Sequence, residues 1–138
     1  MTDKPTFDTN VLIYAFGKHD DKRKHIAKEI IATCNIISLQ VVNETVYVLL
    51  KKFNFQEQEL DKVIEFIKQK FVISNLNINI LDKTLKIAAR YSFSFWDSMM
   101  VASAIDNHCS VLYTEDLQHG QVIDGSLKII NPFINSQV

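Results

Sequence analysis

Four acidic residues stand where short apolar segments give way to helical patterns, and carboxylates so placed can form one site. They are Asp8, Glu44, Asp97 and Asp116. In an open sheet of parallel strands, ligands bind outside the carboxyl ends of the strands. Each of the four acids falls at or just beyond a predicted strand end, or on the first turns of the helix that follows. We therefore expect the four carboxylates to converge at one edge of a sheet.

A cluster of carboxylates requires compensation, because like charges in one pocket either retain protons or bind a cation. Hard oxygen ligands suit Mg²⁺ or Mn²⁺, which keep several waters and take a few carboxylates together with phosphate oxygens. Such ions activate water at neutral pH and stabilise the in-line displacement at phosphorus. The residue types therefore predict a small metal-dependent nuclease.

Other catalytic chemistries lack their signatures in this sequence. The glycines are too scattered for a phosphate-binding loop, and there is no GxGxxG or Walker motif. Cys34 and Cys109 are isolated, as expected for free thiols in a reducing compartment. No histidine has metal-ligand spacing to another, which disfavours zinc. No Ser or Cys nucleophile with a nearby base is indicated.

Each acid also has an ordinary structural explanation. Asp8 could cap the helix that follows it, and Asp97 lies three residues after Ser94, as in a capping box. Glu44 could face solvent, and Asp116 could belong to a turn. Trp96, beside Asp97, is more often a packing residue than a base-stacking platform. The argument for a shared site is that all four acids map to the same edge of the predicted sheet.

The elements that must position these acids alternate between short strands and helices. The predicted strands are 6–8, 35–37, 110–114 and 128–130, with extended backbone also expected at 72–74 and 75–80. The predicted helices are 10–16, one from Asp20 or Asp21 to 33, then 39–53 after Ser38, 57–70, 83–91 capped by Asp82, and one from Ser94 to 107. This alternation predicts a parallel sheet with helices on both faces and right-handed crossovers.

Length and composition are those of one globular domain. The chain has 138 residues, of which 47% are hydrophobic and 22% charged. The first residues show no signal-peptide pattern and no apolar run could span a bilayer, so a cytoplasmic protein is expected. The net charge of −1 is unusual for a protein that holds nucleic acid by charge alone. The basic segment 18–28 is either a local phosphate-binding patch or a solvated helix face.

The sequence resembles the PIN domain family, and within it the single-domain VapC-like toxins. The resemblance covers about residues 6–133, in order, and the segments that carry it are 7–14, Ser38 with Glu44, 95–98 and 112–117. It implies that the whole chain, 1–138, is one three-layer α/β/α domain with a central, mainly parallel sheet. It also implies an endoribonuclease that depends on Mg²⁺ or Mn²⁺.

Carried over by position, the resemblance implies roles for seven residues. The catalytic residues that hold metal would be Asp8, Glu44, Asp97 and Asp116, while Thr9, Asn10 and Thr114 would orient those carboxylates. Asp116 matches the family pattern better than Glu115, although its neighbour remains an alternative. The expected partners are an RNA substrate, a second copy of the chain in a homodimer, and an antitoxin whose tail enters the active-site groove.

Three other functions are compatible with parts of the pattern. A phospho-accepting receiver domain is a small α/β protein with acids at strand ends, but it needs a second acid beside Asp8 and a Lys after the last strand, and Lys128 is poorly placed. A PIN-like module could bind RNA or a partner without cutting it. A flap or double-strand DNA nuclease could use a related site, but the sequence lacks the basic or arching segments expected of one.

Overall fold

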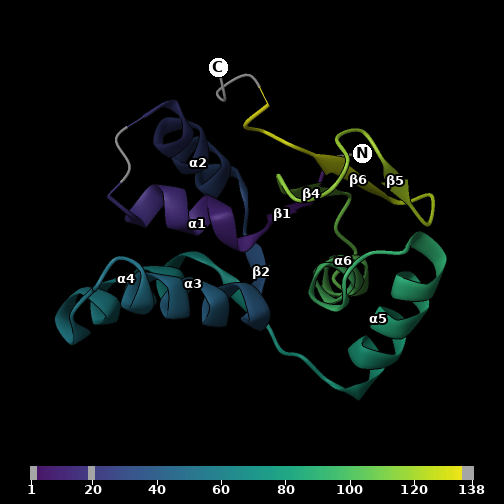
Figure 1. Cartoon of the computed structure of the whole chain (residues 1–138), viewed down its shortest axis with the longest axis horizontal. Helices are drawn as coiled ribbons and strands as arrows, with labels where there is room; N and C mark the ends of the chain where they lie inside the picture. The colour runs from purple at the N-terminus through teal and green to yellow at the C-terminus, as the bar shows by residue number, and fades with distance from the viewer. Residues whose placement is uncertain (1–2, 19–20, 135–138) are drawn as a thin grey trace.

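The computed structural model describes residues 3–18 and 21–134, which form an α/β structure (Figure 1). Its strands are β1 (Pro5–Phe7), β2 (Ile36–Ser38), β3 (Val72–Ser74), β4 (Val111–Tyr113), β5 (Val122–Ile123) and β6 (Leu127–Ile130). Its helices are α1 (Thr9–Phe16), α2 (Lys22–Thr33), α3 (Leu39–Lys51), α4 (Glu57–Lys70), α5 (Ile78–Tyr91) and α6 (Phe95–Asp106).

The strands form two hydrogen-bonded groups that meet at β1. One sheet has the order β1-β4-β6-β5, with β1, β4 and β6 parallel and β5 antiparallel to β6. The other group is the parallel pair β2 and β3. A side-chain bond joins the two groups, because the Thr6 hydroxyl donates to the Ile36 carbonyl at 2.8 Å. The expected mainly parallel sheet is confirmed, with one short antiparallel strand that the sequence pattern did not predict.

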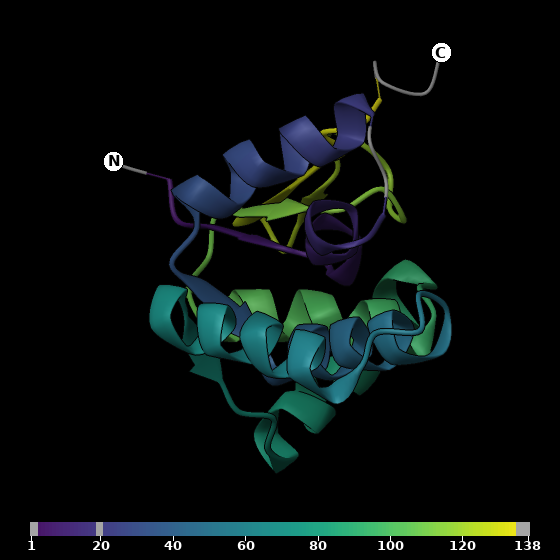
Figure 2. The ribbon, with the colours of Figure 1, turned by 90° about the vertical axis from the view of Figure 1, so that its left-hand side faces the viewer.

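Helices cover both faces of the strands. In Figure 2 the strands lie between α2, above, and α3, α4 and α6, below. Strand and helix residues share one core, which includes Phe7, Leu12, Ile37, Leu112 and Ile129, each with an exposed fraction of 0%. This arrangement is the expected three-layer α/β/α architecture. In residues 3–18 and 21–134, no helix has both the length and the apolar character needed to cross a membrane.

The ends of three strands determine where the acidic residues lie. Strand β1 ends at Phe7 and the next residue, Asp8, caps α1. Strand β2 ends at Ser38, whose hydroxyl accepts from the Val41 N–H at 3.3 Å and so starts α3. Strand β4 ends at Tyr113, in register with Phe7 on β1. Parallel pairing therefore brings the segments that carry the acids to one edge of the sheet.

The structure corrects the sequence prediction in the region before α5. Residues 78–80 were expected to be extended and Asp82 to cap a helix over 83–91, but α5 begins at Ile78. Its cap is Asn77, whose side-chain oxygen accepts from the Ile80 N–H at 3.0 Å. The Asn-rich composition of 75–79 hides the helical pattern, because Asn favours caps and turns. For α2 the cap is Asp21, and Asp20 lies outside the described residues.

Candidate active site

Asp8 is the most enclosed of the candidate acids. Its side chain is 6% exposed, and one oxygen accepts from the N–H of Thr9 while the other accepts from the Thr114 hydroxyl at 2.8 Å. Burial raises the pKa of Asp8 to about 7, the Thr114 bond opposes this rise, and the neighbouring Asp116 carboxyl adds to it. Asp8 is thus a carboxylate whose negative charge is costly in the absence of a cation.

Glu44 is held by two polar side chains. The Thr9 hydroxyl donates to one of its oxygens at 3.0 Å, and the Gln40 amide donates to the other at 2.9 Å. Thr9 immediately follows Asp8, so α1 and α3 are joined at the candidate site. The same Gln40 nitrogen also donates to the backbone carbonyl of Trp96 at 3.1 Å. Glu44 is therefore directed toward the start of α6 and not into open solvent.

Asp97 lies in the first turn of α6, beside the other acids. The hydroxyl of Ser94 accepts from the backbone N–H of Asp97 at 3.1 Å, which caps the helix. Partial burial raises the pKa of Asp97 and the hydrogen bond to Ser94 opposes this rise, while the charges of Asp116 and Glu44 add smaller increases. The electrostatic influence of these two acids on Asp97 indicates that Asp116 and Glu44 each lie near the Asp97 carboxyl group.

Glu115 and Asp116 are adjacent in sequence but have different surroundings. Asp116 lies near both Asp8 and Asp97, since it contributes to the raised pKa of each. Its backbone N–H donates to the Thr114 hydroxyl at 3.1 Å. Glu115 instead accepts from the amide of Asn10 at 2.9 Å. The geometry favours Asp116 as the acid that faces the candidate site, and it places Asn10 on Glu115 and not on one of the four clustered acids.

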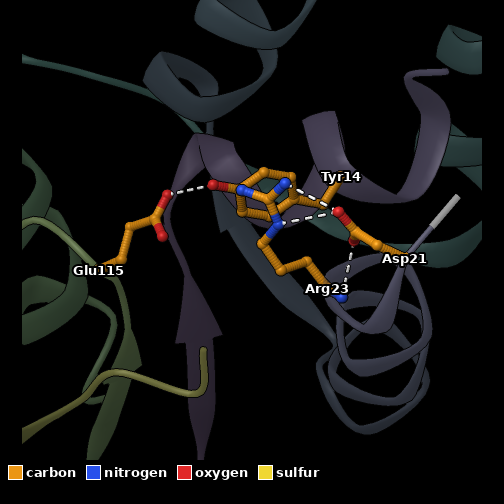
Figure 3. Close-up of polar contacts among 4 residues, drawn as sticks. All are labelled: Tyr14, Asp21, Arg23 and Glu115. Carbon is orange, nitrogen blue, oxygen red and sulfur yellow. Dashed lines mark hydrogen bonds and ion pairs between the residues drawn. The ribbon is translucent and has the colours of Figure 1, made fainter. Parts of the chain in front are cut away.

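A second polar cluster surrounds Glu115 (Figure 3). The Tyr14 hydroxyl donates to Glu115 at 2.5 Å, and the Arg23 guanidinium lies over the Tyr14 ring at 4.8 Å from its centre. Arg23 also pairs with Asp21 at 2.8 Å. Burial raises the pKa of Tyr14 to about 12, and Glu115 adds to the rise. Tyr14 is therefore a neutral donor at physiological pH, and Glu115 is held by α1.

The residues suit a hard divalent ion by donor chemistry, but they do not form a closed cage. Among residues 3–18 and 21–134, no three Asp, Glu, His or Cys side chains are grouped closely enough to hold a metal directly. Mg²⁺ usually keeps several waters and uses only one or two carboxylates with substrate phosphates, so a closed cage is not required. The raised pKa values of Asp8 and Asp97 show acids crowded in a way that a cation would relieve.

The sequence analysis missed two residues that donate hydrogen bonds to acids. Gln40 donates to Glu44 within α3, and Tyr14 donates from α1 to Glu115. Gln40 precedes Glu44 by four residues, a helical spacing at which side chains meet, and this was the available signal. Nothing in the sequence pairs Tyr14 with Glu115, since 101 positions separate them. Only the parallel pairing of β1 with β4 brings them together.

The fold and the site together define a class: an α/β/α protein with an acidic site at the carboxyl edge of a mainly parallel sheet. The family model described as the PIN domain matches residues 6–123. The chain belongs to the PIN domain family.

Solved structures of VapC toxins and their complexes share this fold. VapC20 of Mycobacterium tuberculosis, described as a sarcin-ricin loop cleaving toxin, has a TM-score of 0.67 and 16% identity, over 82% of this chain and 90% of that one. A toxin–antitoxin complex from Klebsiella pneumoniae has a TM-score of 0.69 and 22% identity, over 94% of this chain and 98% of that one. VapBC2 of Rickettsia felis, bound to a promoter DNA fragment, has a TM-score of 0.65 and 15% identity, over 92% of this chain and 98% of that one. No curated protein sequence matches the chain.

Proposed function

We propose that this protein is a metal-dependent endoribonuclease and the toxin of a toxin–antitoxin pair. The observation that carries the proposal is the proximity of acids in a PIN fold: Asp116 lies near Asp8 and Asp97, and Glu44 lies near Asp97. Partly buried carboxylates near other acids and without a neutralising partner are typical of sites that work with a bound cation. The structural similarity to VapC toxins supports the choice of RNA as substrate.

In this proposal the four acids would together bind the metal ion and its water molecules. Asp8, Glu44, Asp97 and Asp116 hold Mg²⁺ or Mn²⁺, in part through water. Thr114 fixes the orientation of Asp8, and Thr9 fixes that of Glu44. When bound, the ion would lower the pKa of a water molecule and stabilise the negative charge that develops on the phosphate oxygens at the scissile bond. Asp8 and Asp97 lie at helix starts, Asp116 closely follows the end of β4, and Glu44 lies in the second turn of α3. These ordered elements would keep the carboxylates in place for an in-line attack.

The partners follow from the same comparison. We propose an antitoxin that blocks the acidic site, by analogy with the toxin–antitoxin complexes of similar fold. A homodimer and a cytoplasmic location complete the proposal. A non-catalytic module that binds RNA or a partner is the alternative function, and it predicts that the acids can be neutralised without loss of the biological activity.

Calorimetric titration with Mn²⁺ tests the metal site without any assumption about the RNA target. We expect saturable binding to the wild type and at least about tenfold weaker binding to Asp97→Asn, since that acid contributes directly to the shared charge. Asp61→Asn is the matched control, because it removes an exposed acid on α4 that is far along the chain from the proposed ligands. Equal binding by Asp97→Asn and the wild type would contradict the proposed metal site.

Incubation of total RNA with the wild type and Mn²⁺ then tests the reaction. We expect a small number of discrete fragments that are absent with Asp8→Asn, Asp97→Asn or a chelator. Fragments that persist in all three reactions would show contamination by another nuclease. Metal binding without any cleavage of RNA or DNA would favour the non-catalytic alternative.

A further inference from the structure

One groove beside the acidic site is not used by the proposed chemistry. It has a volume of 780 Å³ and is lined by α3, the segment after β3 and the start of α6. Tyr47, Leu76 and Trp96 supply its apolar surface, and Glu44 lies in its wall. The side chains of Tyr47 and Trp96 are 63% and 61% exposed. The groove is thus continuous with the candidate active site through Glu44.

Trp96 is fixed relative to the acids although its ring is exposed. Its backbone carbonyl accepts from Gln40, whose amide also holds Glu44. It directly precedes Asp97 in the first turn of α6. The Phe95 ring meets the Trp96 indole edge to face at 5.0 Å between centres. The indole is therefore not a core residue, and its contact with Phe95 is packing at the surface that leaves most of the ring exposed.

The charge of the groove indicates what it can hold. Among the described residues that line it there is the carboxylate of Glu44 but no Lys or Arg. Such a surface repels phosphate and carboxylate groups and favours a neutral, flat, apolar face. Gln40 also lines the groove, and its side-chain oxygen is a buried acceptor without a hydrogen-bond partner in the described part of the chain. A buried acceptor of this kind is stabilised by an N–H donor.

We propose that this groove is a subsite for an unstacked nucleobase of the substrate, which stacks on the indole of Trp96. The proposal rests on the proposed nuclease function and adds a positioning residue, Trp96, for one base of the RNA. A nucleotide whose phosphate lies at the acids must place its base nearby, and the groove is the adjacent apolar volume. Aromatic stacking accepts any base, and the N–H groups of nucleobases provide the donors that Gln40 lacks.

The protein carries a built-in probe for this subsite, because Trp96 is its only tryptophan. The probe ligand is a short single-stranded RNA, added in the presence of Ca²⁺ in place of Mn²⁺ to support binding with minimal cleavage. The comparison ligand is a ribose-phosphate chain of the same length without bases. We expect saturable quenching of tryptophan emission by the RNA and little by the abasic chain, which has the same charge.

Variants of Trp96 separate stacking from a merely structural role. Alanine substitution at a stacked aromatic weakens binding by about tenfold, so Trp96→Ala should bind a labelled RNA about tenfold more weakly in an anisotropy assay. Trp96→Phe keeps an aromatic face and should restore most of the affinity. Val122→Ala is the matched control, since Val122 is another exposed apolar residue, on β5, with 51% exposure. Thermal melts by circular dichroism check that each variant folds.

Three results would overturn the subsite. The first is RNA affinity unchanged in Trp96→Ala. The second is equal quenching by the RNA and the abasic chain. The third is tryptophan emission that shifts to shorter wavelength with protein concentration, alongside dimer formation that Trp96→Ala abolishes, because a second copy of the chain would then cover the groove. The Mn²⁺ titration is independent of Trp96, so failure of this proposal is distinguishable from failure of the metal site.

Discussion

Glu115 and Asp116 are neighbours in the chain, and the contrast between their surroundings separates a structural acid from a functional one. Glu115 accepts hydrogen bonds from Asn10 and from Tyr14, and the Arg23 guanidinium lies over the Tyr14 ring. Asp116 lies among other carboxyl groups and raises the pKa of Asp8 and Asp97. Glu115 has a cation in its cluster, whereas the acids around Asp116 lie near one another without one and would gain from a cation supplied from outside the chain.

The same contrast applies to the two polar regions as wholes. The cluster around Glu115 contains its own cation, Arg23, which lies over the Tyr14 ring and pairs with Asp21. The acidic site contains threonine and glutamine donors but no such cation among the contacts of its described acids. Neutral donors orient a carboxylate without cancelling its charge. The acidic site is therefore preorganised for a cation, and the Glu115 cluster is already satisfied.

Neutralising one acid of each region gives the largest expected difference in cleavage rate. In Asp97→Asn the cleavage rate should fall by at least about a thousandfold, because positioning of the metal and water depends on it. In Glu115→Gln, which keeps the size of the side chain, the rate should fall by less than about tenfold. Single-turnover cleavage of one identified RNA site measures both. Equal losses in the two variants would remove the distinction between the regions.

Asp8→Asn should stabilise the metal-free protein at alkaline pH. The folded pKa of Asp8 is about 7 against an ordinary value of 3.8, so the folded state binds a proton that the unfolded state has lost. The wild type therefore loses stability as pH rises from about 4 to 7. The variant avoids this loss and should be more stable by about 1–3 kcal/mol at pH 8.

Urea melts in chelator at several pH values measure this effect. The difference between Asp8→Asn and the wild type should be near zero at about pH 4 and reach its maximum above pH 7. Saturating Mn²⁺ should reverse the order at pH 8, since only the wild type gains from binding. A difference that does not vary with pH would show that Asp8 is ionised throughout and that burial does not penalise its charge.

Removing a neutral donor tests whether it orients the acid. Thr114→Val deletes the hydroxyl that donates to Asp8 and accepts from the N–H of Asp116, and the site is buried, with Thr114 2% exposed. We expect a loss of about 1–2 kcal/mol of stability and a further rise in the pKa of Asp8. Thr45→Val is the control, because the Thr45 hydroxyl bonds only within its helix, to the Val41 carbonyl. Similar losses in both variants would contradict a special role for Thr114.

Much of this structure was predictable because local chemistry and tertiary packing agree. Ser38 begins α3 and Asp21 begins α2 as expected of N-caps, and α4 spans the predicted residues 57–70. The four acids were proposed as a site because strand ends in a parallel sheet share an edge, and that inference needs only the approximate strand positions. The alternation of elements predicted the parallel sheet with helices on both faces, and the resemblance to the family predicted the PIN fold.

What the sequence did not predict depends on contacts between distant segments or on weak local signals. Strand β5 is two residues long and exists only by pairing with β6, so no periodicity could reveal it. The start of α5 was missed because Asn77 was taken as part of an extended stretch. The exposure of Trp96 depends on how α3 and α6 meet, and the choice between Glu115 and Asp116 depends on α1.

Removing the Tyr14 hydroxyl should have the smallest effect on stability and cleavage, and it tests a single hydroxyl group of the Glu115 cluster. Tyr14→Phe keeps the ring under Arg23 and deletes the donor to Glu115 together with the hydrogen bond between the hydroxyl and Arg23, which leaves Asn10 as a donor to Glu115. We expect a loss of about 1 kcal/mol of stability and less than a threefold change in cleavage. The raised pKa of Tyr14, about 12, means that the loss should not vary between pH 6 and 9.

A double-mutant cycle with Glu115→Gln shows whether the effect passes through Glu115. If it does, Tyr14→Phe should cost less in the Glu115→Gln background, because the charge-assisted bond is already weakened there. Addition of the two separate losses would mean that the Tyr14 hydroxyl acts through a partner other than Glu115, such as Arg23. A Tyr14→Phe variant that instead bound Mn²⁺ more tightly would show that a released Glu115 can enter the acidic site, and that α1 keeps the two acids apart.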